Sequence, residues 1–169
     1  MNTRDFAEFL KKFSSAAEAG DGDAFAACFT EDGIYRDYVY GDHHGRAEIA
    51  HMMSHQFHRD AGKDYRWEMF DPMCEGNLAY AWSLSTFTSI VPEFTGQRVT
   101  IDGMSKFILE DGLIKDYRES VNGGVAMAQL GVQPERLAKV CAKWGRLLEA
   151  QPETVDFLAH EKGAWMKST

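Results

Sequence analysis

The sequence has few of the residues that mark several common protein classes. Its three cysteines, Cys28, Cys74 and Cys141, are widely spaced and form no C-x-x-C pair, which indicates neither a disulfide framework nor a redox centre. Four prolines and no low-complexity stretch favour an ordered globular chain. No apolar run is long enough to span a bilayer, and the charged N-terminus lacks the apolar core of a signal peptide. We therefore expect a cytoplasmic protein that does not bind membranes.

Basic residues are also in the minority. The formal net charge is -8 at pH 7, and the lysines and arginines form no cluster. Nucleic-acid binding needs a basic surface that can release counterions from phosphates, so no nucleic-acid partner is expected. The sequence also lacks a glycine-rich phosphate loop and a dinucleotide-binding fingerprint. No nucleotide or redox cofactor is therefore implied.

The first third of the chain is mainly helical in pattern. Phe6, Phe9, Leu10 and Phe13 recur at helical spacing, and Gly20 follows them as a helix end. The stretch "DGDAFAACF" predicts a second, shorter helix capped by an aspartate. The stretch "GRAEIAHMMSHQFHRDAG" predicts one continuous third helix that ends near Gly62 and has its apolar side chains on one face.

Strand patterns surround and follow the third helix. The run "GIYRDYVY" predicts a first strand whose side chains at Tyr35 and Asp37 share one face. From residue 64 onward, alternating patterns predict strands at 64–71, 77–91, 97–110 and 113–121, with Asp111 and Gly112 at the last turn. Four consecutive strands indicate an antiparallel meander. The predicted class is α+β, with helices covering one face of a curved sheet.

The C-terminal part of the chain is helical in pattern again. An amphipathic helix begins at Pro134 and carries an apolar stripe from Leu137 to Leu148. We predict a domain at residues 1–124 and a helical extension at 125–169 that packs on it. The aromatic-rich strand at 77–91 and the stripe at 137–148 hold more apolar surface than one small domain needs, so we also predict a homodimer.

Three motifs together resemble the SnoaL-like branch of the nuclear-transport-factor-2-like superfamily. They are "GDGDAFAACFTEDGIYRD", "HGRAEI" and "FILEDGLIKDYRE", and the resemblance covers roughly residues 5 to 122. It implies a cone-shaped α+β fold of the cystatin-like type, to which the C-terminal helices are extra. The superfamily contains ketosteroid isomerases, polyketide cyclases, epoxide hydrolases, dehydratases and non-catalytic binding modules. The fold therefore does not name the reaction.

The resemblance implies candidate catalytic residues on two strands. The proton-shuttling aspartate of the isomerases falls at Asp37, whereas their oxyanion-stabilising tyrosine falls at Phe13. The water-orienting tyrosine and asparagine of limonene epoxide hydrolases fall at Tyr35 and Asp37, and their last-strand aspartate falls at Glu119. The Arg-x-Asp pair of these hydrolases has no counterpart. The catalytic candidates are thus Asp37, Tyr35 and Glu119.

Further candidates would line a hydrophobic pocket around these residues. They are mainly aromatic: Tyr117, Trp82, Tyr80, Phe13, Met53, Phe57, Phe107 and Trp67. Four histidines on the third helix and before it, His44, His51, His55 and His58, form a stripe opposite the apolar face. We expect this stripe to face solvent or a partner subunit and to hold no metal, with His44 near the pocket rim.

Two functions of different classes remain. The first is acid/base catalysis of the isomerase, cyclase or hydrolase type on a small hydrophobic carbonyl or polyketide-like molecule, with Asp37 moving a proton. The second is a module of the same fold that binds a small ligand, or dimerises, without chemistry. The surroundings of Asp37 distinguish them, because a buried carboxylate with a raised pKa favours the enzyme and a carboxylate paired with Arg36, Arg46 or Arg118 favours the module.

Overall fold

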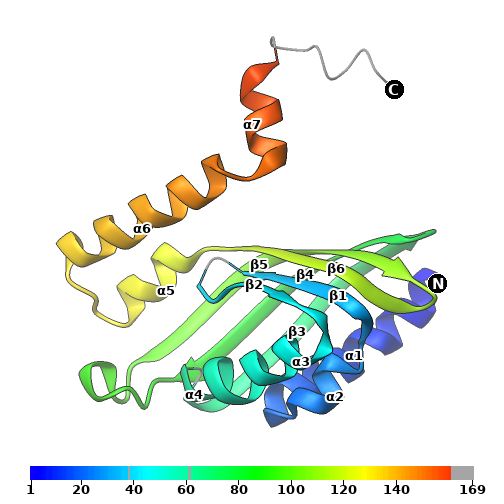
Figure 1. Cartoon of the computed structure of the whole chain (residues 1–169). Helices are drawn as coiled ribbons and strands as arrows, with labels where there is room; N and C mark the ends of the chain where they lie inside the picture. Colours follow the sequence, from blue (N-terminus) through cyan, green and yellow to red (C-terminus); the bar gives the residue numbers. More distant parts are fainter. Residues whose placement is uncertain (38, 61, 161–169) are drawn as a thin grey trace. The chain divides into compact units, whose positions relative to one another are not determined.

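The computed structural model describes residues 1–37, 39–60 and 62–160, which form two compact units (Figure 1). The first unit comprises Met1–Gly131, and the second begins at Val132. The first unit is the α+β domain that the sequence predicts, with helices on one face of a six-stranded sheet. None of the helices in the described residues is long and apolar enough to cross a membrane.

The first two helices have caps that the sequence predicts. Helix α1 (Thr3–Ala19) starts where the Asn2 side chain accepts a hydrogen bond from the Asp5 backbone, and it ends at Gly20, whose φ of 65° is left-handed. Helix α2 (Gly22–Ala26) starts at Asp21, whose carboxylate accepts from the Ala24 backbone. The short polar residues and the glycine thus set the limits of both helices.

The predicted third helix is interrupted by a π-helical segment. It consists of α3 (Gly45–His51), the π-helix η1 (Met52–Phe57) and α4 (His58–Asp60). A π-turn adds a residue and shifts the faces of the helix on either side of it. Ile49, Met52 and Met53 are all fully buried, so they share the inward face that the helical spacing predicts.

The sheet has the strand order β2-β1-β6-β5-β4-β3. Its strands are β1 (Phe29–Asp37), β2 (Gly41–His44), β3 (Lys63–Glu75), β4 (Leu78–Thr88), β5 (Arg98–Glu110) and β6 (Leu113–Val121). The antiparallel meander from β3 to β6 confirms the prediction, and a single 3-10 turn, η2 (Pro92–Phe94), lies between β4 and β5. Strand β1 pairs in parallel with β6, and the sequence did not predict β2, because its four residues "GDHH" show no apolar alternation.

The core lies between α1, α2, α3 and the inner face of the sheet (Figure 1). Phe13 of α1 is at its centre, with its ring within 4.6 to 6.2 Å of five other aromatic rings, those of Phe25, Phe29, Trp67, Phe107 and Tyr117. Aromatic pairs at this spacing contribute about 0.5–1.5 kcal/mol each beyond the area they bury. This aromatic core fixes the first helix against four strands of the sheet.

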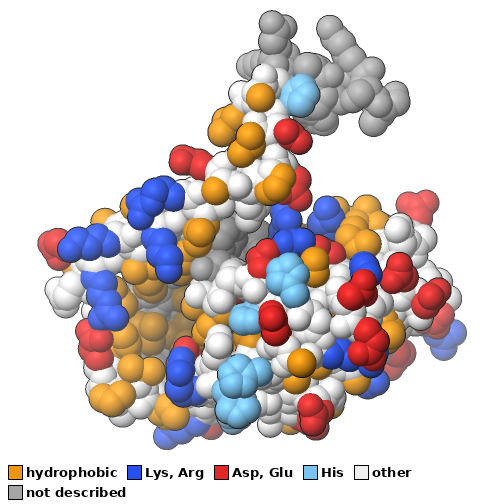
Figure 2. Space-filling view, in the orientation of Figure 1, with side chains coloured by type: hydrophobic (Ala, Val, Ile, Leu, Met, Phe, Trp, Pro, Cys, Tyr) orange, Lys and Arg blue, Asp and Glu red, His pale blue; other side chains and the backbone are white. Residues whose placement is uncertain are grey.

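The C-terminal helices begin within the first unit. Helix α5 (Gly123–Gln129) belongs to the first unit, and the Gln129 side chain bonds both the N–H and the carbonyl of Thr100 on β5 at 2.9 Å. Helices α6 (Pro134–Glu149) and α7 (Pro152–Ala159) form the second unit, and basic side chains follow one side of α6 (Figure 2). The packing of these two helices on the first domain stays a prediction.

The outer face of the sheet carries exposed apolar side chains. Tyr80 is 40% and Trp82 is 37% exposed, so the prediction that they line the interior is wrong. The register explains the error: Ala79 pairs with the buried Phe107, so the odd-numbered residues of β4 face inward and Tyr80 and Trp82 face outward. Met73, Leu78 and Met104 are exposed in the same region of the sheet.

We predict that this outer face takes part in a homodimer. Apolar side chains gathered on one sheet face are the usual sign of an interaction surface. Light scattering at micromolar concentration should give twice the monomer mass for the unmodified chain, and Trp82→Glu should shift the population toward monomer. A monomer mass for the unmodified chain would contradict this prediction.

We also predict that Gly22 is required for the packing of α2 on the third helix. A Cβ atom at Gly22 would lie 2.3 Å from the Ala50 carbonyl oxygen, which is backbone and cannot rotate away. Gly22→Ala should therefore lower the free energy of unfolding by about 1–3 kcal/mol in urea titrations. Gly145→Ala is the control, because a Cβ there meets nothing within 4 Å and alanine favours the helix.

Candidate functional site

A polar cluster lies on the inner face of the sheet, where β1 and β6 run side by side. The parallel register places Tyr35 next to Tyr117, and their rings stack with centroids 4.8 Å apart. Both tyrosines are fully buried. Two residues further along each strand, on the same face, are Asp37 and Glu119. The structure thus brings together the three predicted catalytic residues and Tyr117.

Glu119 is held by a hydrogen-bonded chain from β5. The Tyr117 hydroxyl donates to Glu119 Oε2 at 2.8 Å, and the buried Ser105 Oγ lies 3.1 Å from the same hydroxyl. Tyr117 has one hydroxyl proton, which it donates to Glu119, so Ser105 is the donor to Tyr117. The chain fixes one carboxyl oxygen of Glu119 as an acceptor and leaves Oε1 for other partners.

The two carboxyl groups influence each other's ionisation. Burial, and then the charge of Asp37, raise the pKa of Glu119 to about 8, while the Tyr117 hydrogen bond opposes this rise. Burial also raises the pKa of Asp37, against the effect of the Val39 and Tyr40 backbone N–H groups and of His43. At neutral pH Glu119 is therefore mainly protonated, and because the charge of Asp37 acts on Glu119, Asp37 loses its proton before Glu119 does. Because Oε2 accepts from Tyr117, the acid proton of Glu119 is best placed on Oε1.

Two of the three arginines that the sequence offered as partners for Asp37, Arg36 and Arg46, have other contacts. Arg36 contacts Asp116 at 2.8 Å and also Asp42, and Arg46 contacts Glu31. Side chains alternate between the two faces of a strand, and Arg36 therefore lies on the opposite face from Tyr35 and Asp37. The carboxylate of Asp37 instead accepts hydrogen bonds from the backbone of Val39 and of Tyr40. It is half-buried without an ion pair to Arg36 or Arg46.

The sequence interpretation missed His43, which is part of this cluster. His43 pairs with Tyr35 across the β1-β2 hairpin, so both side chains are on the inner face. The sequence reading had placed His44 at the pocket rim, but His44 is exposed. Among the described residues, His43 Nε2 and the Tyr35 hydroxyl are buried and have no hydrogen-bond partner. Gly41 and Asp42 of the "GDHH" stretch lie in β2 and pair with Asp37 and Arg36, so they do not mark the hairpin turn, and the stretch carries no signal that gives this register.

Two further tyrosines border the cluster and were not predicted. Tyr65 of β3 has a pKa raised well above its usual value, first by burial and then by the charge of Glu119, which places its hydroxyl near that carboxyl group. The Tyr40 hydroxyl donates to Asp60 at 3.3 Å. The ring of Phe57 lies between these tyrosines, with centroids 6.2 Å from Tyr40 and 5.0 Å from Tyr65.

The remaining predicted lining residues have different environments. Phe13, Met53, Trp67 and Phe107 are buried core residues, and Phe57 is partly buried beside the bordering tyrosines. Phe13 offers no polar atom at the position where the isomerases have their oxyanion tyrosine. Asp102 of β5 is exposed and pairs with Leu84 on the outer face, so this carboxylate is not part of the cluster.

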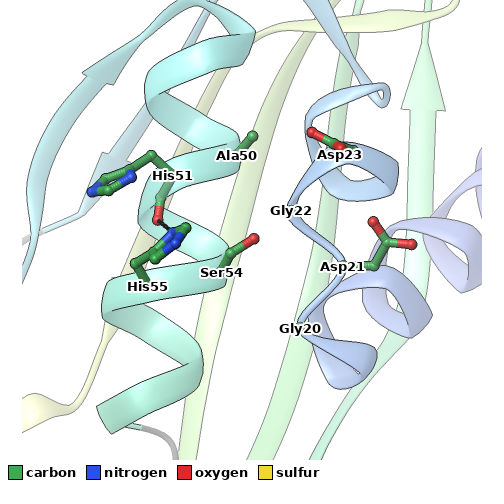
Figure 3. A pocket seen from close by; sticks show the side chains of 8 residues that line it. All are labelled: Gly20, Asp21, Gly22, Asp23, Ala50, His51, Ser54 and His55. Atoms are coloured by element: carbon green, nitrogen blue, oxygen red, sulfur yellow. Dashed lines mark hydrogen bonds between the residues drawn. The ribbon is translucent and has the colours of Figure 1, made fainter.

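The histidine stripe lies on the surface, as predicted. His44, His51, His55 and His58 are all exposed, and Figure 2 shows histidines on the surface of this unit. The rings of His51 and His55 stack at 4.5 Å and border an open hollow between α2 and the third helix (Figure 3). Within residues 1–37, 39–60 and 62–160 there is no group of three potential ligands that could hold a metal ion.

Comparisons with known proteins agree with this architecture. The family model of the SnoaL-like domain matches residues 10–117. Among curated proteins, none matches the chain significantly in sequence. Among solved structures, TsrD from Streptomyces laurentii is similar with a TM-score of 0.67 and 16% identity, over 79% of this chain and 99% of TsrD.

Two other solved structures share this fold, and their names refer to different activities. An epoxide hydrolase of the LEH-like type from M. tuberculosis has a TM-score of 0.58 and 15% identity, over 76% of this chain and 90% of its own. A protein with a ketosteroid isomerase-like fold from Catenulispora acidiphila has a TM-score of 0.65 and 15% identity, over 76% of this chain and 95% of its own. At these identities the likeness shows the fold alone.

We predict that Glu119 makes the stability of the fold depend on pH. Its folded pKa of about 8 exceeds its ordinary value of 4.5, so the folded state binds more protons than the unfolded state between these pH values. Stability then falls as pH rises through this window, by at most about 1.4 kcal/mol per pH unit. Glu119→Gln removes the effect, so its free energy of unfolding should rise relative to the unmodified chain between about pH 5 and about pH 8.5.

Urea titrations at several pH values measure this difference. Glu75→Gln, at an exposed carboxylate on β3, is the matched control and should keep the same pH dependence as the unmodified chain. A difference between Glu119→Gln and the unmodified chain that does not change with pH would show that Glu119 ionises normally in the fold.

Proposed function

Because the chain belongs to the SnoaL-like domain family, which its family model matches over residues 10–117, we propose that it is an acid/base catalyst of the isomerase, cyclase or hydrolase type. Its substrate is a small hydrophobic carbonyl or polyketide-like molecule. The observation that carries this proposal is the pair Asp37 and Glu119, two carboxyl groups on one inner face whose pKa values are both raised, first of all by burial.

The pair provides a base and an acid for one proton transfer. Asp37, ionised, takes a proton from an acidic C–H group or from a water molecule. Glu119, protonated, donates its Oε1 proton to the substrate oxygen on which negative charge develops. The substrate then keeps its charge, Asp37 ends protonated and Glu119 ends ionised, and the reverse transfers restore the starting state. General acid/base catalysis of this kind contributes about 10²- to 10⁴-fold.

The hydrogen-bonded chain behind Glu119 supports this assignment. When Glu119 loses its proton, the Tyr117 hydroxyl already donates to the carboxylate that forms, and Ser105 donates to Tyr117. The pKa of Tyr117 is raised well above its usual value by burial and by Glu119, so Tyr117 stays a donor at neutral pH. The hydrogen bond from Tyr117 thus stabilises the carboxylate form of Glu119, and no positively charged side chain is needed for this.

The site differs from both precedents that the sequence suggested. Phe13 removes the oxyanion tyrosine of the steroid isomerases, and β4 offers the small inward residues Ala79, Ala81 and Ser83 in place of an Arg-x-Asp pair. Glu119 replaces the missing acid in either scheme. A reaction in which one carboxyl group gives a proton while the other takes one fits the residues that are present.

We predict that Asp37→Asn lowers turnover by about 10²- to 10⁴-fold while ligand affinity changes little, because the amide keeps the shape but cannot accept the proton. Activity of the unmodified protein should rise as Asp37 ionises and fall as pH increases through about 8, where Glu119 loses its proton. Steady-state kinetics between about pH 5 and about pH 9 measure both the rise and the fall of activity with pH. Asp102→Asn, on the outer face, is the matched control.

The substrate for this test comes from the protein itself. Native mass spectrometry of the purified protein identifies a co-purified small molecule, and its chemistry then selects the assay. If the Asp37→Asn protein converts that molecule at the normal rate, the catalytic proposal is wrong. A ligand that binds tightly, and that the unmodified protein leaves unchanged, would make the non-catalytic binding module the correct alternative.

A further inference from the structure

Two buried polar atoms beside the carboxyl pair have no hydrogen-bond partner in the described part of the chain. They are the Tyr35 hydroxyl and His43 Nε2, which come from residues paired across the β1-β2 hairpin. Leaving a buried polar group unsatisfied destabilises the folded state. The hydroxyl groups of Tyr117, Ser105 and Tyr40 in the same region are all hydrogen-bonded. Two unmet groups on neighbouring strands therefore indicate a binding role.

The two atoms have opposite hydrogen-bonding character. The pKa of Tyr35 is raised well above its usual value by burial and by nearby acidic groups, so its hydroxyl keeps its proton and donates. Burial lowers the pKa of His43, so its ring is neutral at pH 7. The ring donates to the Tyr40 backbone, and because Nε2 has no partner, the donor is Nδ1. In this tautomer Nε2 carries a lone pair and accepts.

A donor and an acceptor on two residues paired across the hairpin match a hydroxyl group. The ligand's hydroxyl oxygen accepts from Tyr35, and its hydroxyl proton is donated to His43 Nε2. A ketone or ether oxygen satisfies Tyr35 alone, since it has no proton to donate. An apolar group satisfies neither atom and leaves both unpaired.

We propose that Tyr35 and His43 form a recognition site for a hydroxyl group on an otherwise apolar ligand. This inference rests on the proposed function, because it names the substrate class as an alcohol or enol that lies next to the carboxyl pair. The hydroxyl fixes the ligand by two points on β1 and β2, so that the reacting group lies over Asp37 and Glu119. Both atoms are buried, so ligand binding here requires surrounding side chains to move, as side chains at binding sites commonly do.

Three probes that share one aromatic ring system test the site without any reaction. They are 2-naphthol, which can donate and accept, 2-methoxynaphthalene, which can only accept, and naphthalene, which can do neither. Equilibrium dialysis should show that 2-naphthol binds about fivefold or more tightly than 2-methoxynaphthalene, and that the latter binds more tightly than naphthalene. His43→Phe should remove the first difference, and Tyr35→Phe should remove the second.

Control variants separate recognition from general damage. His43→Gln retains an acceptor and should restore part of the preference for 2-naphthol. His44→Phe and Tyr80→Phe change exposed residues of the same types, and they should leave the order of the three affinities unchanged. A preference for 2-naphthol that survives both His43→Phe and Tyr35→Phe would overturn the proposal.

A second measurement does not depend on the probes. Nitrogen NMR of the ligand-free protein near pH 7.5 should show His43 as the neutral tautomer with an unprotonated Nε2, and a proton on Nε2 would overturn the proposal. Failure of either experiment leaves the proposed function open to its own test, because turnover by Asp37 and Glu119 is measured separately. Likewise, if the Asp37→Asn protein turned over its substrate normally, the expected order of the three probe affinities would stay the same.

Discussion

The parallel pairing of β1 with β6 is the interaction on which the candidate site depends. It joins a strand from the N-terminal part of the sheet to the last strand of the meander, with Tyr35 opposite Tyr117. The stacked rings fix the register, and a change of one residue would turn Asp37 to the outer face. Because two carboxyl groups then share a buried region, their ionisation becomes coupled. The chemistry of the site is thus a consequence of strand register.

The aromatic core sets the other condition for this coupling. Phe13 occupies the position of a polar residue in the isomerases, and its ring packs against Tyr117. An apolar neighbour on that side keeps water away from the tyrosine and from Glu119. Desolvation is accordingly the largest cause of the raised pKa of Glu119, ahead of the charge of Asp37. An apolar residue at position 13 is therefore consistent with the proposal that Glu119 acts as the acid.

The sequence predicted the fold well where its periodicity was strong. The meander and helix α1 show clear alternation or helical spacing, and the side-chain parity of Tyr35, Asp37, Tyr117 and Glu119 followed from it. The parity of β4 could not be assigned in this way, because its apolar residues Leu78, Tyr80 and Trp82 form the outer face while small residues face the core. Residue size near the helices, and not hydrophobicity alone, decides which side of β4 is buried.

His43 shows a second limit of sequence analysis. A four-residue strand without apolar alternation gives no periodic signal, so the hairpin and the inward direction of His43 become visible only through pairing. The same pairing leaves Tyr35 and His43 with unmet hydrogen bonds beside a coupled acid and base. A fold that optimised stability alone would replace such groups with apolar residues or pair them. Their presence on the side of the sheet that holds Asp37 and Glu119 is best explained if one ligand contacts all four residues.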